Sequence, residues 1–572
     1  MKSKRYFILP FVFLFSTHIY AQRVTWWSEQ TPPKTIAVCK RPKGIYEMNL
    51  AQSLAGLAVQ ALNEGLDTEG VWINGGASDY CIYFKTLLQR LNAIKGNEYD
   101  VWEFVQKLGK KGVVKGYVLY DYSISPSVNI ATVQAGLRKG VLVDITQEKK
   151  AKRLGLAKLF DATIPELTDS LNFEAVKEQL NNNLIVLIDP ANGNNRDYAI
   201  AHKSMVYYGV DSFLNYLMGW VKPLSPVIGW NRGPEFEHIA PCTRYGLINT
   251  ASDWCLNLSL LACNLNTSIG TFKQFDPTAI DWKSDKNYHA FVMSDGDNMQ
   301  WTFGNFIHNP NYWANPYNAE LSMGFTTCAV NISMAGNDAL QELIRTQQPQ
   351  VSVVEYGGGY YYPDLFAEKL PNRKELLRDF ARTVNIHMKK AGVHVFAFIC
   401  RNLYSKGAME AYQIFAEELE DLTGMIAVQY APYNGGNGDV FWVKNREGIE
   451  IPVLTAKNMV WANLSLERSG SPSVIADCIN KVATTAEEDE RSLGWTIVHA
   501  WSRFDRGEDG QILDAPQNNP ASARGVTPLK WGKDLINTDT EVVSIEEVLW
   551  RIRMRHNPEQ TKKIVENIKS CK

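Results

Sequence analysis

The chain has 572 residues, of which 45% are hydrophobic and 21% charged, so it is long enough for several domains with large cores. Its 59 Lys and Arg residues nearly balance its 61 Asp and Glu residues, which leaves a formal charge of −2. Proteins that bind nucleic acid usually carry an excess of basic residues that contact the phosphates. This chain has no such excess, so we do not expect nucleic acid as a partner.

The first residues have the pattern of a signal peptide. Lys2, Lys4 and Arg5 precede an apolar run over residues 7–15, and Ala21 supplies a small residue for cleavage. The run is too short to span a bilayer, and no later apolar stretch of about 18 residues follows it. We predict signal peptide 1–21, no membrane span, and export to the periplasm or the extracellular space.

Residues 22–275 are predicted to form an N-terminal α/β region. Short β-branched or aliphatic runs alternate with stretches of helical spacing, which favours mostly parallel sheets. The expected strands are Thr35–Cys39, Gly70–Ile73, Gly116–Tyr120, Gly140–Asp144 and Leu184–Asp189.

The nine cysteines form no C-x-x-C pair with metal-ligand spacing. Most are expected to be buried free thiols, because several lie in apolar runs. One or two disulfides remain an alternative in an oxidising compartment, and Cys242 with Cys255 or Cys263 would be the first pair to test.

Residues 276–572 are predicted to form a C-terminal β/α barrel of seven or eight parallel strands. An open doubly wound sheet is the competing architecture, which pattern alone does not separate from a barrel. The expected strands are His289–Ser294, Leu321–Thr327, Val351–Glu355, Val393–Cys400, Met425–Gln429, Asn458–Trp461, Gly494–Ala500 and the pair Val542-Val543.

A glycine-rich loop carrying three tyrosines follows the third of these strands. It reads Gly357-Gly358-Gly359-Tyr360-Tyr361-Tyr362-Pro363, and it resembles at every specified position the motif that names the GxGYxYP family of glycoside hydrolases. The resemblance implies small subdomains in the N-terminal region, a barrel-like catalytic domain and a saccharide substrate. Independently, glycine lets backbone approach a ligand closely, and tyrosine offers a flat face with a polar tip to a sugar ring.

An acidic turn follows the first barrel strand. Ser294-Asp295-Gly296-Asp297-Asn298 resembles a second motif of the same family. Asp295 and Asp297 are two residues apart, so an extended backbone would point both to one side. They could divide general acid and base duty, or bind a divalent cation through oxygen. An ordinary turn is the structural alternative. We predict that they are catalytic and that no cofactor is required.

Glu355 is the third predicted catalytic residue, since glycoside hydrolysis generally needs two carboxyls flanking the bond. It ends a strand directly before the tyrosine loop. An ion pair with Arg401 at the rim of the barrel is the alternative for this side chain.

Other polar and aromatic residues follow the predicted strands, where ligands of parallel α/β folds bind. We predict that they contact the sugar, with packing as the alternative for each ring. The set is Asn298, Trp301, Gly357, Gly359, Tyr360, Tyr362, Arg401, Asn402, His499 and Trp501. A second loop contains Glu235, Glu237 and His238, and connecting loops with such residues often carry function. We expect this loop to fold over the mouth of the barrel from the N-terminal side.

Several enzyme classes lack their motifs here. There is no phosphate loop, no G-x-S-x-G nucleophile elbow and no H-E-x-x-H zinc helix. The predicted function is therefore an exported glycosidase acting on an oligo- or polysaccharide. A non-catalytic glycan-binding protein, or a lyase or deacetylase acting on sugars, is the alternative.

Overall fold

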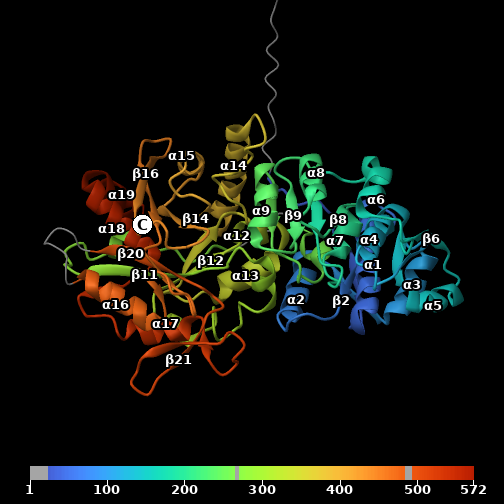
Figure 1. Ribbon diagram of the computed structural model, residues 1–572, viewed down its shortest axis with the longest axis horizontal. Helices are drawn as coiled ribbons and strands as arrows, with labels where there is room; N and C mark the ends of the chain where they lie inside the picture. The colour runs from blue at the N-terminus through green and yellow to red at the C-terminus, as the bar shows by residue number, and fades with distance from the viewer. Residues whose placement is uncertain (1–23, 264–269, 484–491, 572) are drawn as a thin grey trace, which may run out of the picture.

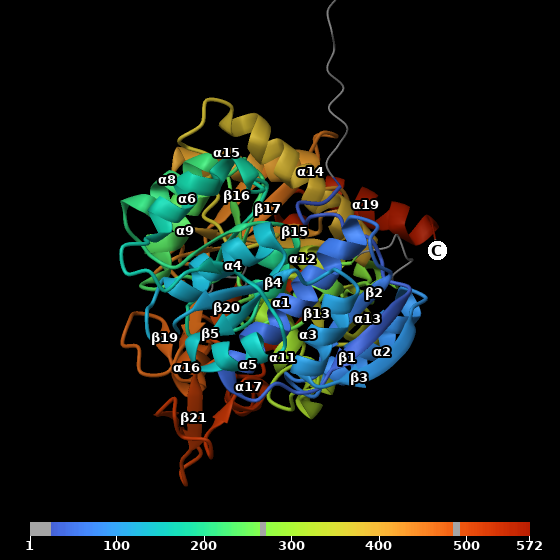
Figure 2. The ribbon, with the colours of Figure 1, turned by 90° about the vertical axis from the view of Figure 1, so that its right-hand side faces the viewer.

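The computed structural model describes residues 24–263, 270–483 and 492–571; the predicted signal peptide at 1–21 lies outside them. The molecule is elongated, with the large sheet and its helices in one half and the three small sheets of the N-terminal region in the other (Figure 1). The half with the large sheet also contains a small antiparallel sheet of order β22-β21-β23, with β21 Arg503–Arg506, β22 Ile512–Ala515 and β23 Ala523–Arg524. Seen from the end, the small sheets lie in front of the large one (Figure 2).

The N-terminal region contains three separate parallel sheets. The first has the order β2-β1-β3, with β1 Thr35–Cys39, β2 Glu69–Ile73 and β3 Ile94–Tyr99. The second has the order β5-β4-β6, with β4 Gly116–Tyr120, β5 Gly140–Asp144 and β6 Lys158–Asp161. The third has the order β10-β9-β7-β8, with β7 Ile185–Leu187, β8 Met205–Tyr207, β9 Pro226–Gly229 and β10 Ile248–Thr250.

Helix α1 (Gly44–Asn63) joins these sheets because it packs on β2, on β5 and on α7 (Arg196–Ala201) of the third unit. Residues 49–62 of α1 are buried throughout, as expected for a helix covered on all sides. A Cβ at Gly56 would lie 2.5 Å from the carbonyl oxygen of Asp197, so glycine allows α1 and α7 to approach closely.

The C-terminal region is built on an eleven-stranded sheet. Its main path runs β16-β17-β15-β14-β13-β12-β11-β20-β18-β19, and β24 pairs with the first half of β11. Only the β16–β17 pairing is antiparallel. The strands are β11 Asn287–Met293, β12 Met323–Thr327, β13 Ser352–Tyr356, β14 Val395–Cys400, β15 Gly424–Gln429, β16 Val440–Lys444, β17 Glu450–Thr455, β18 Asn458–Val460, β19 Ser469–Gly470, β20 Leu493–Val498 and β24 Thr540–Val542.

This sheet is strongly curled around an apolar interior. Alternate residues of strands from both ends of the path meet inside it, including Val354 of β13, Leu454 of β17 and Trp495 of β20. The Trp495 indole donates to the carbonyl of Leu454 at 3.1 Å. Helix α18 (Ile545–His556) covers the amino ends of the strands with Ile545, Val548, Leu549 and Ile552.

The prediction of an α/β fold with parallel sheets is confirmed, and the curl is that of a half-barrel. In the described residues β17 pairs with β15 and β18 pairs with β20, and no ladder joins β17 to β18. The two strands follow each other along the chain with only Ala456 and Lys457 between them. A closed barrel stays a prediction.

Buried contacts fasten the N-terminal region to the large sheet. Asn331, in α12 (Ala329–Ala335), accepts hydrogen bonds from the indoles of Trp26 at 2.9 Å and Trp27 at 3.1 Å. Arg90, at the end of α2 (Tyr80–Arg90), forms a buried ion pair with Asp338 of α13 (Asn337–Thr346) at 2.7 Å. Breaking such a pair is costly, because it leaves a buried charge without its partner. These contacts therefore hold the N-terminal region against the large sheet.

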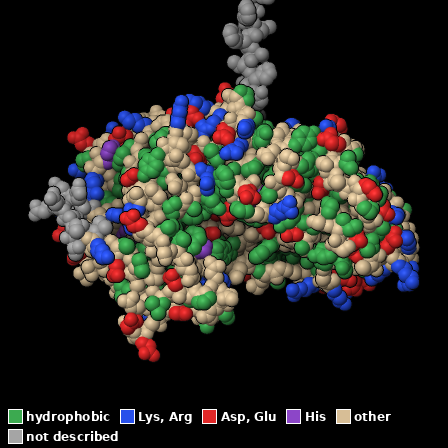
Figure 3. Space-filling view, viewed as in Figure 1, with side chains coloured by type: hydrophobic (Ala, Val, Ile, Leu, Met, Phe, Trp, Pro, Cys, Tyr) green, Lys and Arg blue, Asp and Glu red, His purple; other side chains and the backbone are tan. Residues whose placement is uncertain are grey.

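All nine cysteines are free thiols in this structure, so the candidate disulfide of Cys242 with Cys255 or Cys263 is not formed. Among the described residues, no helix combines the length and the apolar character needed to cross a membrane. On the face shown in Figure 3, basic and acidic side chains are interspersed.

Gly359→Ala tests the contact between the tyrosine loop and the third sheet. Gly359 has φ +144°, and a Cβ there would lie 2.4 Å from Cγ2 of Ile248. We expect strain and overpacking to lower the free energy of unfolding by about 2–4 kcal/mol, measured by urea denaturation. Gly448→Ala is the control, because φ is +79° there but nothing lies within 4 Å, and its loss should be near 1 kcal/mol. Equal losses would contradict the packing role of Gly359.

Candidate active site

The acidic turn at the end of β11 is held against β12 by close backbone contact. The N–H of Gly296 donates to Oγ1 of Thr326 at 2.9 Å, and that hydroxyl donates to the carbonyl of Met293 at 2.7 Å. A Cβ at Gly296 would lie 1.8 Å from the carbonyl oxygen of Thr326. Asp295 has φ +68°, an unfavourable value for a residue with a side chain. In this tight turn both aspartates line one cavity.

The cavity has a volume of about 250 Å³ and lies where the carboxyl ends of the large sheet meet the third N-terminal sheet. Three of its lining residues are carboxylic acids, namely Glu235, Asp295 and Asp297. The remaining lining residues are Trp230, Ser294, Asn298, Gln300, Tyr356, Tyr360, Ile399, Tyr433, Trp461 and Trp501.

Asp295 is oriented by two donors. The indole Nε1 of Trp501 donates to its Oδ1 at 3.0 Å, and the hydroxyl of Ser294 donates to its Oδ2. These two hydrogen bonds fix the orientation of the carboxyl group of Asp295. Trp501 is itself packed against Trp301, with ring centroids 4.8 Å apart.

The environments of the other two acids raise their pKa values. Burial raises the pKa of Asp297 well above its usual range, and the negative charges of Asp295 and Glu235 add to the rise. Burial and the charge of Asp295 also raise the pKa of Glu235, while hydrogen bonds from Tyr360 and Tyr430 oppose the rise. The Tyr360 hydroxyl donates to Oε2 of Glu235 at 2.7 Å. Neighbouring carboxyl groups whose environments shift their pKa values differently are the arrangement that acid–base catalysis uses.

Aromatic rings surround these acids. Trp230 stacks on Tyr360 with centroids 5.9 Å apart and planes at 12°. Among the other rings, Tyr433 stacks on Trp461 at 5.5 Å, and Trp461 stacks on His499 at 3.5 Å. Such rings present apolar faces to a ligand and polar atoms at their edges, which suits a sugar.

Five of the predicted site residues line this cavity: Asp295, Asp297, Asn298, Tyr360 and Trp501. Others support it from behind. His499 lies under Trp461 and its Nδ1 bonds the hydroxyl of Ser502 at 2.8 Å, and Trp301 packs on Trp501. Tyr362 is fully buried and packs edge-on against Tyr360 at 5.9 Å.

Gly357 and Gly359 shape the tyrosine loop, with φ +87° and +144°. Arg401 lies outside the lining, with its guanidinium over the ring of Phe236 at 4.2 Å and donating to the carbonyl of Tyr430 at 3.1 Å. The backbone N–H of Asn402 donates to Asp364 at 2.9 Å, and its side-chain oxygen accepts from the N–H of Tyr404. We therefore place Arg401 and Asn402 outside the cavity, where they position neighbouring segments.

Glu355 is not brought to the cavity with the aspartates. Its side chain is fully buried, and its two oxygens accept from the backbone N–H of Val330 at 2.8 Å and of Gly358 at 2.9 Å. Strand β13 extends through Tyr356, and Val354 and Tyr356 face the interior. Because alternate residues face opposite sides of a strand, Glu355 faces α12 instead. The Glu355–Arg401 ion pair is not among the pairs of the described residues.

Eight lining residues lie outside the predicted set: Trp230, Glu235, Ser294, Gln300, Tyr356, Ile399, Tyr433 and Trp461. Glu235 begins helix α9 (Glu235–Arg244), in the loop that was expected to fold over the mouth of the barrel. The sequence could have indicated Tyr356, because side chains alternate between the two faces of a strand and Tyr356 is therefore on the same face as Val354.

No three His, Cys, Asp or Glu side chains converge to hold a metal ion within the described part of the chain. A divalent cation bound by Asp295 and Asp297 stays a prediction.

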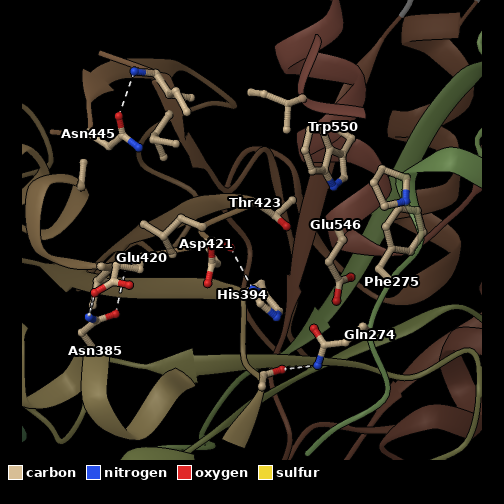
Figure 4. Close-up of a pocket in the computed structure, with 18 of the residues that line it drawn as sticks. Gln274, Phe275, Asn385, His394, Glu420, Asp421, Thr423, Asn445, Glu546 and Trp550 are labelled. Carbon is tan, nitrogen blue, oxygen red and sulfur yellow. Dashed lines mark hydrogen bonds between the residues drawn. The ribbon is translucent and has the colours of Figure 1, made fainter. Parts of the chain in front are cut away.

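A larger hollow, of about 750 Å³, opens at the opposite end of the strands (Figure 4). Its lining includes His394, Thr423 and Ile449, which lie just before β14, β15 and β17. Its charged groups are largely engaged, as in the pairs of Glu418 with Arg378 at 2.6 Å and with Arg382 at 3.1 Å. Ligands of parallel α/β sheets bind at the carboxyl ends of strands, so the smaller cavity is the better candidate.

Comparison with known families and structures identifies the family and the fold. The domain described as "GxGYxYP putative glycoside hydrolase C-terminal domain" matches residues 285–505. The GxGYxYP third domain matches residues 182–263, and the second N-terminal domain matches residues 114–179. The chain belongs to the GxGYxYP family.

A crystal structure described as that of a putative hydrolase from Bacteroides thetaiotaomicron has the same fold. The TM-score is 0.76 at 17% identity, and the match covers 93% of this chain and 97% of the other. The search of curated proteins found no match.

Glu355→Gln tests the buried position of Glu355. Burial raises the pKa of Glu355 to about 8, although hydrogen bonds from the N–H groups of Val330 and Gly358 oppose the rise. In the unfolded chain a Glu releases its proton near pH 4.3. Between about pH 4.3 and about pH 8 the folded protein therefore binds the proton and the unfolded chain does not, so wild-type stability should fall as pH rises through this range. The variant cannot ionise, so its stability relative to wild type should improve by up to about 1.4 kcal/mol per pH unit.

The measurement is urea denaturation of both proteins at about pH 5 and about pH 8. A stability difference that stays constant between these pH values, or that moves in favour of wild type at the higher one, would mean that Glu355 is ionised in the folded protein.

Proposed function

We propose that this protein is an exported glycoside hydrolase that cleaves a neutral oligo- or polysaccharide at the cavity between the large sheet and the third N-terminal sheet. The observation that carries the proposal is the convergence of Glu235, Asp295 and Asp297 on one cavity walled by aromatic rings. The family assignment supports the class of reaction.

The proposed roles follow from the environment of each acid. Glycoside hydrolysis needs a protonated acid for the leaving oxygen and a carboxylate that acts as nucleophile or activates water. Glu235, whose pKa is raised by burial, is the proposed proton donor. Asp295, held by Trp501 and Ser294, is the proposed carboxylate. Asp297, whose pKa burial raises well above its usual range, is the proposed hydrogen-bond donor to a sugar hydroxyl.

Two further elements belong to the proposal. The curled sheet, with β17 continuing into β18, would act as a closed barrel whose carboxyl end holds the site. The charged and apolar start of the chain would direct export, with cleavage near Ala21. An exported enzyme would meet saccharides outside the cytoplasm.

Glu235→Gln and Asp295→Asn should each lower kcat about a hundred- to ten-thousand-fold, because each removes one partner of the acid–carboxylate pair. Turnover is to be measured on whichever glycan the wild type cleaves in a screen of plant and host polysaccharides.

Glu237→Gln is the matched control, since Glu237 is exposed on the first turn of the same helix and does not line the cavity. Glu355→Gln is a second control, because its carboxyl faces away from the cavity. Both controls should retain turnover. Wild-type rates in Glu235→Gln and Asp295→Asn would refute the assignment.

Tyr360→Phe should shift the alkaline limb of the kcat/KM profile to higher pH. The Tyr360 hydroxyl stabilises the ionised form of Glu235, so its removal raises the pKa of Glu235 further and preserves the protonated acid to higher pH. Tyr361→Phe is the control, because Tyr361 packs on Phe380 at 5.1 Å and lies outside the cavity. A downward shift, or equal shifts in both variants, would contradict Glu235 as the acid.

A further inference from the structure

A second hollow, of about 450 Å³, lies at the carboxyl ends of the strands of the third N-terminal sheet. Its size is within the range of about 300–1,000 Å³ that small-molecule sites have. The lining residues are Ile45, Asp189, Ala191, Asn192, Gly193, Tyr208, Trp230, Asn231, Asp253 and Trp254.

The topology of the third sheet favours a ligand at this position. In the order β10-β9-β7-β8, the chain passes from β7 to β8 on one side and then to β9 on the other. Parallel sheets bind ligands outside the carboxyl ends of their strands, where the order reverses in this way. Asp189 follows β7, Tyr208 follows β8, and Trp230 follows β9. The hollow therefore occupies the switch point of this sheet.

The second hollow adjoins the candidate active site. Trp230 lines both cavities. Gln300, which lines the active-site cavity, accepts a hydrogen bond from the N–H of Trp254 at 2.9 Å. A ligand that fills the first cavity can thus continue past Trp230 onto the third sheet.

The chemistry of the hollow suits sugar rings. Trp254 lines the hollow and is 71% exposed, so its ring is accessible for stacking by a ligand. Oδ1 of Asp253 is buried and has no hydrogen-bond partner among the described residues. Asp189 accepts from the N–H of Ala191 at 2.8 Å and bonds the hydroxyl of Tyr208. Two carboxyls here would repel a phosphate or a uronate and would accept from hydroxyl groups.

We infer that this hollow binds further sugar residues of the chain whose bond is cleaved beside Glu235 and Asp295. Trp254 provides the stacking platform, and Asp189 and Asp253 accept hydroxyl hydrogens. The inference rests on the proposed function and specifies its substrate as a neutral saccharide long enough to pass Trp230 and reach the third sheet. A disaccharide would occupy the first cavity alone.

The test compares full-length proteins that carry Glu235→Gln, so that glycans are bound without turnover. Binding is measured on an array of neutral and acidic plant and host oligosaccharides, and then by calorimetry on a length series of the best neutral binder. Trp254→Ala should weaken binding of the long members about tenfold and leave the disaccharide unchanged. Trp254→Phe should restore most of the loss, because it keeps an aromatic face.

Tyr216→Ala is the matched control. Tyr216 is a 48% exposed aromatic residue on α8 (Ser212–Trp220) of the same domain, and it lies outside both hollows. The affinity of the Tyr216→Ala variant for oligosaccharides of every length should equal that of the parent protein. Equal affinity of Trp254→Ala and its parent for all lengths, or no binding of any array glycan by the parent, would overturn the inference.

Turnover by the protein without the Glu235 substitution separates this inference from the proposed function. Length-dependent loss of binding in Trp254→Ala without cleavage of any glycan would support the extended site and refute the hydrolase. Cleavage of a glycan with no effect of Trp254→Ala at any length would support the hydrolase and refute the extended site.

Discussion

The docking of the tyrosine loop onto β10 is the contact on which the candidate site depends. The N–H of Tyr360 donates to the carbonyl of Asn249 at 2.8 Å, and the carbonyl of Gly358 accepts from Asn331 at 3.1 Å on the other side of the loop. Glycine at 359 permits this approach, since a Cβ would overlap Ile248. The contact sets the carboxyl edge of the third sheet against that of the large sheet, and Tyr360 thereby reaches Glu235, 125 residues away.

Burial at this junction decides the chemistry of the acids. Rings from both sheets exclude water, and that desolvation raises the pKa of Asp297 and of Glu235. Asp295 instead receives hydrogen bonds from Trp501 and Ser294. One cavity therefore contains carboxyls in different environments, as acid–base catalysis requires. The same junction brings the second hollow to Trp230, so that a long saccharide could contact both domains.

Much of the sheet was predictable because its strands are aliphatic runs. All eight strands expected in the C-terminal region lie within about two residues of their expected bounds. Strands β16 and β17 escaped prediction, since β16 is only partly buried and Pro452 interrupts the pattern of β17. Glu355 was expected in the site, but its neighbours Val354 and Tyr356 face the interior, so the alternation of side chains places Glu355 on the opposite side of β13.

The sequence alone determined the family motifs, the parallel α/β character and the position of Asp295 and Asp297 at a strand end, because these depend on neighbouring residues along the chain. Only the tertiary structure decided that Glu235 and Trp230 complete the site and that Glu355 caps α12. Those outcomes depend on how two separate sheets dock and on which face of a strand is enclosed. Local patterns do not encode contacts between residues more than a hundred positions apart, such as Glu235 and Tyr360.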